Sequence, residues 1–83
     1  MNIDLRNLPE GYEVTNAYSD AVFVKHVSSR DRWSLRVEER SEGNWVLSIA
    51  PPGNAGWTHE CLFDNAQDAW DAGTARLALG VWE

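Results

Sequence analysis

The sequence predicts an α+β fold: an antiparallel sheet of three to four strands, or five if a short N-terminal segment also pairs, with one C-terminal helix packed on one face. Two observations predict it. From about residue 32 to residue 63, apolar and polar residues alternate with the period of a strand that has one buried face. From Asp64 onward, apolar residues recur at three- and four-residue spacing, which is the period of a helix. The 83 residues suffice for one domain over 1–83 and one core.

Turn signals divide the sheet region, about 21–63, into strands. Residues 1–11 are expected to form an irregular lead-in, which ends in the turn signal Leu8-Pro9-Glu10-Gly11. The expected strands are a short edge strand over 12–14, followed by 21–27, 32–40, 44–50 and 57–63. Residues 16–20 are turn-like, and Gly43 suits the positive φ of a hairpin. Two prolines at the start of 51–56 predict a loop there, because proline cannot continue a strand ladder.

Three tryptophans fall on the predicted buried face of the sheet. Trp33, Trp45 and Trp57 occupy odd-numbered apolar positions, and the 12-residue spacing between them matches one strand plus its turn. Aromatic residues at strand period are usually packing residues. We therefore expect these tryptophans to form a core ladder under the helix rather than a platform for ligand stacking.

The predicted helix spans about 65–79. Asp64 fits its N-cap, with Gln67 at the third helical position as in a capping box. The apolar stripe consists of Ala66, Ala69, Trp70, Gly73 and Leu77. A glycine inside a helix costs up to about 1 kcal/mol relative to alanine. Gly73 therefore predicts a close approach of the helix backbone to the sheet.

The composition is acidic and poor in cysteine. The 13 Asp and Glu residues exceed the seven Lys and Arg residues, and the resulting net charge of −6 disfavours nonspecific attraction to phosphate backbones. Most of the bases lie between residues 25 and 40, and acids dominate elsewhere. The lone Cys61 excludes an internal disulfide, which for so small a fold is typical of a reducing compartment. With neither a signal-peptide pattern nor a long apolar run, we expect a cytoplasmic protein that does not engage membranes.

No motif for catalysis, metal binding or phosphate binding stands out. His59 and Cys61 would point the same way from one strand, where an imidazole can activate a thiol, but their apolar neighbours favour a structural cysteine. A zinc site would need His26, His59, Cys61 and a fourth ligand, without the usual CxxC or HxxxH spacing. Phosphate-loop, dinucleotide and nucleophile-elbow motifs are absent. We expect no enzyme activity, no cofactor and no metal.

Two charged surfaces remain as candidates for recognition. The first is an acidic surface near the helix start, which would bind a protein partner with a basic surface and consists of Glu60, Asp64, Asp68 and Asp71. The second is the open sheet face, which would contact nucleic acid through Arg32, Arg36 and Arg40, with Glu38 and Glu60 among them. The net charge favours the protein partner over direct nucleic-acid binding. The sequence leaves the oligomeric state open.

The segment from Trp45 to Ala75 resembles the AP2-like and integrase-arm DNA-binding modules. It has the order Trp-x-Leu-x-Ile, a loop, a tryptophan and then Leu62-Phe63-Asp64-Asn65-Ala66-Gln67-Asp68-Ala69. Those modules place three strands against one helix and use the open sheet face on DNA. By this resemblance Arg32, Arg36 and Arg40 would be the DNA-reading residues.

Two other resemblances imply different partners. The order of sheet then helix is similar to that of HicB-type antitoxins, although Pro51-Pro52-Gly53-Asn54 stands where those often carry a Pro-Gly-Cys element. The size and charge resemble those of small phage-encoded inhibitors, including anti-CRISPR proteins. These resemblances imply either an antitoxin-like regulator or an inhibitor that engages a basic, nucleic-acid-binding surface of its partner.

Overall fold

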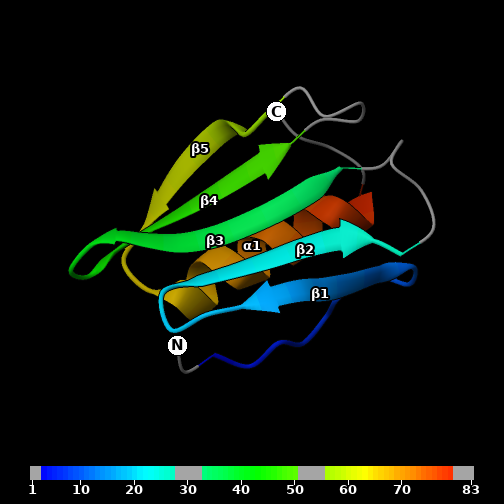
Figure 1. The fold of residues 1–83 in the computed structure, drawn as a ribbon, viewed down its shortest axis with the longest axis horizontal. Coiled ribbons are helices and arrows are strands. Elements are labelled where there is room, and N and C mark those ends of the chain that lie inside the picture. The colour runs from blue at the N-terminus through cyan, green and yellow to red at the C-terminus, as the bar shows by residue number, and fades with distance from the viewer. Residues whose placement is uncertain (1–2, 28–32, 51–55, 80–83) are drawn as a thin grey trace.

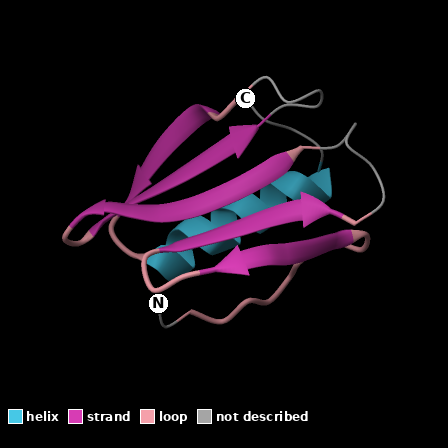
Figure 2. Cartoon of the chain, in the orientation of Figure 1, coloured by secondary structure: helices cyan, strands magenta, loops and turns pink. Residues whose placement is uncertain are grey.

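The computed structural model describes residues 3–27, 33–50 and 56–79. One five-stranded antiparallel sheet carries a helix across one of its faces (Figures 1 and 2). The elements are β1 (Tyr12–Ala17), β2 (Ala21–His26), β3 (Ser34–Ser41), β4 (Asn44–Ala50), β5 (Thr58–Phe63) and α1 (Ala66–Leu79). The strands are paired in chain order, so each strand lies beside the next one along the chain. The predicted α+β class is confirmed, and β1 supplies the fifth strand.

The core lies between α1 and the centre of the sheet. Its fully buried side chains come from the inner face of β2, β3 and β4 and from α1, and include Val24, Leu35, Val37, Leu47, Ile49 and Trp70. Trp33 and Trp45 are half-buried and pack against this core, as predicted. The alternation in β3 and β4 therefore places Leu35, Val37, Leu47 and Ile49 under the helix, whereas Val46 of β4 lies on the other face.

β1 is longer than the predicted edge strand over 12–14. It continues to Ala17, because Asn16 and Ala17 pair with Phe23 and Val22 of β2 beyond a register shift at Thr15. Thr15 is the extra residue of a β-bulge, and the pairing of β1 with β2 continues beyond it. The predicted turn over 16–20 is therefore too long by its first two residues.

The β3–β4 hairpin closes with a two-residue loop. Gly43 has φ 77°, as predicted for this position, and its N–H donates to the Glu39 carboxylate at 3.1 Å. A residue with a side chain is strained at this φ, so glycine is the favoured residue at this turn.

α1 begins one residue later than its predicted cap implies. The N-cap is Asn65 and not Asp64: its side-chain oxygen accepts from the N–H of Asp68 at 2.8 Å, and its amide donates to the Asp68 carboxylate at 3.0 Å. The predicted stripe faces the sheet, and the buried residues of the helix are Ala66, Ala69, Trp70, Gly73, Thr74 and Leu77. Within the described ranges, no helix combines the length and the apolar character needed to cross a membrane.

Trp57 lies on the opposite face of the sheet from the one predicted. Leu47 pairs with Cys61 and Ile49 pairs with Thr58, so β5 advances by three residues while β4 advances by two. One extra residue in a strand reverses the alternation beyond it. Cys61 therefore packs on the helix side, whereas Trp57 contacts residues on the other face.

The N-terminal lead-in is part of the packed structure. Helix α1 makes its close contacts with β3, β4 and β5. Ile3 and Leu8 pack against the core and extend it beside the helix, with Tyr12 and Val14 of β1. The irregular backbone predicted for residues 1–11 is seen in the described part of this range, which contains a turn but no helix or strand.

Gly73 approaches the sheet closely, and we predict that a methyl group there destabilises the fold. A Cβ atom at Gly73 would lie 2.4 Å from Leu35 Cδ1 and 2.8 Å from Leu47 Cδ1, and both leucines are fully buried. Gly73→Ala should lower the free energy of unfolding by about 1–2 kcal/mol, because overpacking outweighs the helix propensity gained. Urea unfolding measures the change.

The double variant Gly73→Ala/Leu35→Ala separates the clash from other effects. Leu35→Ala alone should cost about 2–5 kcal/mol through its cavity, and the new methyl group should fill part of that cavity. The double variant should therefore lose less stability than the sum of the two single changes. Strict additivity would contradict the close contact.

Candidate protein-interaction surface

The sheet face away from α1, here called the outer face, carries a closed network of ion pairs and hydrogen bonds. We call its members the polar network: Arg36, Glu38 and Arg40 of β3, Ser48 of β4 and Glu60 of β5. Arg36 Nη2 lies 3.2 Å from Glu38 Oε1, and Arg40 Nε donates to the same oxygen at 3.1 Å. Arg40 also donates to both oxygens of Glu60, from Nη1 at 3.1 Å and from Nη2. Ser48 closes the network, accepting from Arg36 at 3.3 Å and donating to Glu60 at 3.4 Å.

The pair between Arg40 and Glu60 crosses a whole strand. β4 lies between β3 and β5, so the two side chains meet over β4. Neighbouring strands are about 4.8 Å apart, and an arginine side chain is long enough to bridge much of the resulting gap of about 10 Å. Ser48 of the polar network is 0% exposed and its neighbour on this face, Val46, is 1% exposed, although both point away from the helix. The middle of the outer face is therefore covered by the chain's own side chains.

Three aromatic side chains lie beside the polar network and form what we call the aromatic cluster: Tyr18, Phe23 and Trp57. The Trp57 ring packs on the guanidinium of Arg36, whose Cζ atom is 4.7 Å from the ring centroid. Phe23 meets Trp57 at a centroid distance of 6.0 Å, and Tyr18 meets Phe23 edge-on at 6.2 Å. Tyr18 is 57% exposed and is the outermost of the three. The predicted role of Trp57 in the core ladder is therefore wrong.

Two of the three arginines predicted to form a nucleic-acid face, Arg36 and Arg40, are engaged within the chain. Arg32 lies outside the described residues. The side chain of Arg36 is only 15% exposed, and both Arg36 and Arg40 face carboxylates of the polar network. Because two guanidiniums face two carboxylates, the polar network carries no net charge. Neither guanidinium is therefore free, and among the described residues of this face Lys25 of β2 is an exposed base without an ion pair.

The contact between Arg40 and Glu60 changes the pKa of both groups. The hydrogen bond from Arg40 lowers the pKa of Glu60. The hydrogen bonds to Glu60 and then to Glu38 raise the pKa of Arg40. Both partners are nearly half exposed, so water screens the pair and it contributes little to stability. Its effect is to hold the two charges in place over β4.

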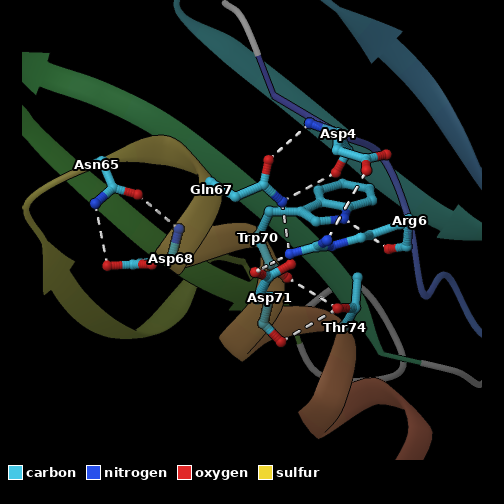
Figure 3. Close-up of polar contacts among 8 residues, drawn as sticks. All are labelled: Asp4, Arg6, Asn65, Gln67, Asp68, Trp70, Asp71 and Thr74. Atoms are coloured by element: carbon cyan, nitrogen blue, oxygen red, sulfur yellow. Dashed lines mark hydrogen bonds and ion pairs between the residues drawn. The ribbon is translucent and has the colours of Figure 1, made fainter.

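Hydrogen bonds and an ion pair join Asp4 and Arg6 of the N-terminal segment to the first two turns of α1 (Figure 3). The Gln67 amide accepts from the N–H of Asp4 at 2.7 Å and donates to the carbonyl of Asp4 at 3.0 Å. The Arg6 guanidinium lies 3.2 Å from Asp71. The indole N–H of Trp70 donates to the carbonyl of Arg6 at 2.8 Å, which satisfies the polar group of this fully buried side chain. Asp71 is therefore paired within the chain.

Four other acids gather at one end of the sheet. The β1–β2 turn, the β3–β4 hairpin and the β5–α1 connection all lie at this end, because Ala21 pairs with Glu38 and Trp45 pairs with both Glu39 and Phe63 (Figure 1). We call this region the acidic end, and its exposed acids are Asp20, Glu42, Asp64 and Asp68. None of these four acids forms an ion pair with a described residue.

The four acids that the sequence predicted to form one surface lie in three different places in the fold. Asp64 and Asp68 lie together at the acidic end, whereas Glu60 pairs with Arg40 on the outer face and Asp71 pairs with Arg6. Asp20 and Glu42 were not among the acids predicted from the sequence. Their positions in hairpin turns were the available signal, because successive hairpins bring alternate turns back to the same end of a sheet.

The residues considered for thiol or zinc chemistry do not form a described site. Cys61 is half-buried against the core, and the Arg76 guanidinium donates to its Sγ atom at 3.5 Å. The His59 side chain lies outside the described part of the structure. In the ranges that are described, no three His, Cys, Asp or Glu residues could hold a metal ion together. The carboxylates of the acidic end are therefore separate charges rather than a chelating group.

Comparison of the chain with protein-family models, with curated proteins and with solved structures finds no match. The resemblances to DNA-binding modules, antitoxins and phage inhibitors therefore stay predictions. The sheet of this chain has five strands, two more than the three-stranded modules place against their helix.

The attachment of the N-terminal segment predicts a pH-dependent contribution to stability. Hydrogen bonds from Arg6 and then Gln67 lower the pKa of Asp71 in the folded state. Because the pKa of Asp71 is lower in the folded state than in the unfolded state, its ionised carboxylate stabilises the fold. This stabilisation is fully present above the unfolded-state pKa and is lost as the pH falls through the folded-state pKa. Arg6→Gln should raise the pKa of Asp71 toward its ordinary value, as measured by NMR titration of the carboxyl group. The stability difference between wild type and Arg6→Gln should shrink as the pH is lowered below about 4.

Arg76→Gln is the matched control, because Arg76 lies in the last turn of α1, away from Asp71. The pKa of Asp71 should be the same in this variant as in wild type. An unchanged pKa of Asp71 in Arg6→Gln would show that the ion pair does not persist in solution.

Proposed function

We propose that this chain is a small protein-binding module that engages a basic surface on a partner protein. The partner would use the same basic surface to bind nucleic acid when this chain is not bound. The observation that carries the proposal is the acidic end, where acids from three connections and the helix start lie exposed. The net charge of −6 adds a long-range attraction toward a basic partner. An inhibitor that occupies a nucleic-acid-binding surface needs this type of charge.

The arrangement of the arginines supports a protein partner over nucleic acid. Direct binding of a phosphate backbone depends on cations that can neutralise phosphates. Arg36 and Arg40 already face Glu38 and Glu60, and a phosphate would have to compete with these carboxylates. The acids that remain unpaired would repel a phosphate backbone. An antitoxin-like regulator is compatible with the same surface, since its partner would also be a protein.

Neutralising the acidic end should slow capture of the partner. Glu42→Gln/Asp64→Asn removes two charges without removing a described ion pair. With a partner isolated by affinity capture from cells of the native host, we expect association to slow about fivefold at low salt, with a smaller effect at high salt. Surface plasmon resonance at several salt concentrations measures both quantities.

The matched control is Glu10→Gln/Glu13→Gln, which removes two charges at the opposite end of β1. This variant should associate at close to the wild-type rate. Equal slowing by the two double variants would indicate an effect of total charge and would exclude the acidic end as the contact surface. Nucleic acid added to the partner should compete with wild type, and its failure to compete would contradict the proposed target surface.

A mobility-shift assay separates this function from nucleic-acid binding through the outer face. At about 50 mM salt, where phosphate contacts are strongest, we expect no shift of single- or double-stranded oligonucleotides. Arg36→Gln/Arg40→Gln should also give no shift and serves as the control. A shift with wild type that this double variant abolishes would favour the nucleic-acid function instead.

A further inference from the structure

The outer face combines exposed apolar side chains with a polar network that is already neutralised. Tyr18 is 57% exposed and Leu62 is 78% exposed. Trp57 and Phe23 are half-buried and in contact with each other, and the Arg36 guanidinium packs on the Trp57 ring. Exposed aromatic rings backed by packed neighbours are typical of the central contact residues of protein interfaces.

The strand register places these exposed side chains on both sides of the polar network. Ala21, Glu38, Val46 and Leu62 form one row across β2 to β5. Tyr18 lies at the β2 side of this row, because its N–H donates to the carbonyl of Ala21 at 2.7 Å. The row runs along the same end of the sheet as the acidic end. The Tyr18 edge of the aromatic cluster therefore lies at the acidic end.

We propose that the aromatic cluster, at its Tyr18 edge, receives arginine side chains of the basic protein partner, with Asp20 of the same turn as a countercharge. This inference rests on the proposed function and adds a specific contact to it. Asp20 lies in the same turn as Tyr18, and its exposed side chain forms no ion pair with a described residue. A guanidinium placed on the Tyr18 ring would therefore meet a π face and an unpaired carboxylate together.

Stacking and charge together favour arginine over a lysine, a nucleobase or a second copy of this chain. The cluster already binds one guanidinium, since Arg36 packs on Trp57 at 4.7 Å. An arginine is more weakly hydrated than a lysine and stacks better on an aromatic ring. A nucleobase could also stack there, but its phosphates would lie near Asp20 and the acidic end. A second copy of this chain would bring the same unpaired acids into repulsion.

Binding of short peptides tests this contact directly. The probes are a nine-residue oligoarginine and a nine-residue oligolysine, titrated into ¹⁵N-labelled protein. We expect oligoarginine to bind about three- to tenfold more tightly than oligolysine. Its largest shifts should occur at Tyr18, Asp20 and Phe23 and at the indole N–H of Trp57.

Variants of Tyr18 separate the aromatic contact from simple charge attraction. Tyr18→Ala should abolish the preference for oligoarginine over oligolysine, while Tyr18→Phe should keep it, because the ring is retained. Leu79→Ala is the control for loss of an exposed apolar side chain, since Leu79 is 75% exposed at the far end of α1. This control should bind both peptides as wild type does.

The outcomes distinguish this inference from the proposed function. An equal preference for oligoarginine in Tyr18→Ala and wild type would overturn the aromatic contact and leave the acidic end intact as a binding surface. Absence of binding of either peptide to wild type at low salt would overturn both. Tighter binding of a single-stranded oligonucleotide than of oligoarginine would show that the cluster binds nucleobases. A dimer mediated by Tyr18 would show that it binds a second copy of this chain.

Discussion

The packing of α1 against the centre of the sheet is the interaction on which the rest of this structure depends. Gly73 brings the helix backbone close to Leu35 and Leu47, and the buried Trp70 ring packs among the same strands. This contact commits most aliphatic side chains of β2, β3 and β4 to one face. The other face must then be made compatible with water by different means. The charge distribution of the whole molecule follows from that division.

The outer face meets this requirement with internal ion pairs and aromatic packing. Arg36 and Arg40 face two carboxylates, so neither contributes a free positive charge, and Lys25 is the exposed base of the described part of this segment that forms no ion pair. The unpaired acids of the acidic end are left in the connections and at the helix start, where water solvates them. The same arrangement exposes Tyr18 and Leu62 beside neutralised charge rather than beside a basic groove.

Local patterns predicted most of the fold, and they failed where pairing between strands intervened. The helix stripe and the inner positions of β3 were predicted correctly, because burial on one face imposes the period directly. The position of Trp57 was not, because a bulge in β5 is defined only relative to β4. The N-cap at Asn65 also differed from the prediction, since Asp64 and Asn65 are both good caps.

The sequence by itself determined the strand and helix periods, the acidic balance and the lack of a disulfide, because each depends on residue type and on spacing within one element. Only the tertiary structure decided which charges are neutralised. Arg6 meets Asp71 from 65 residues away, and Arg40 meets Glu60 across an intervening strand. The acidic end likewise joins turns distant in the chain. Such contacts depend on sheet register and helix placement, and residue spacing along the chain does not encode these distances.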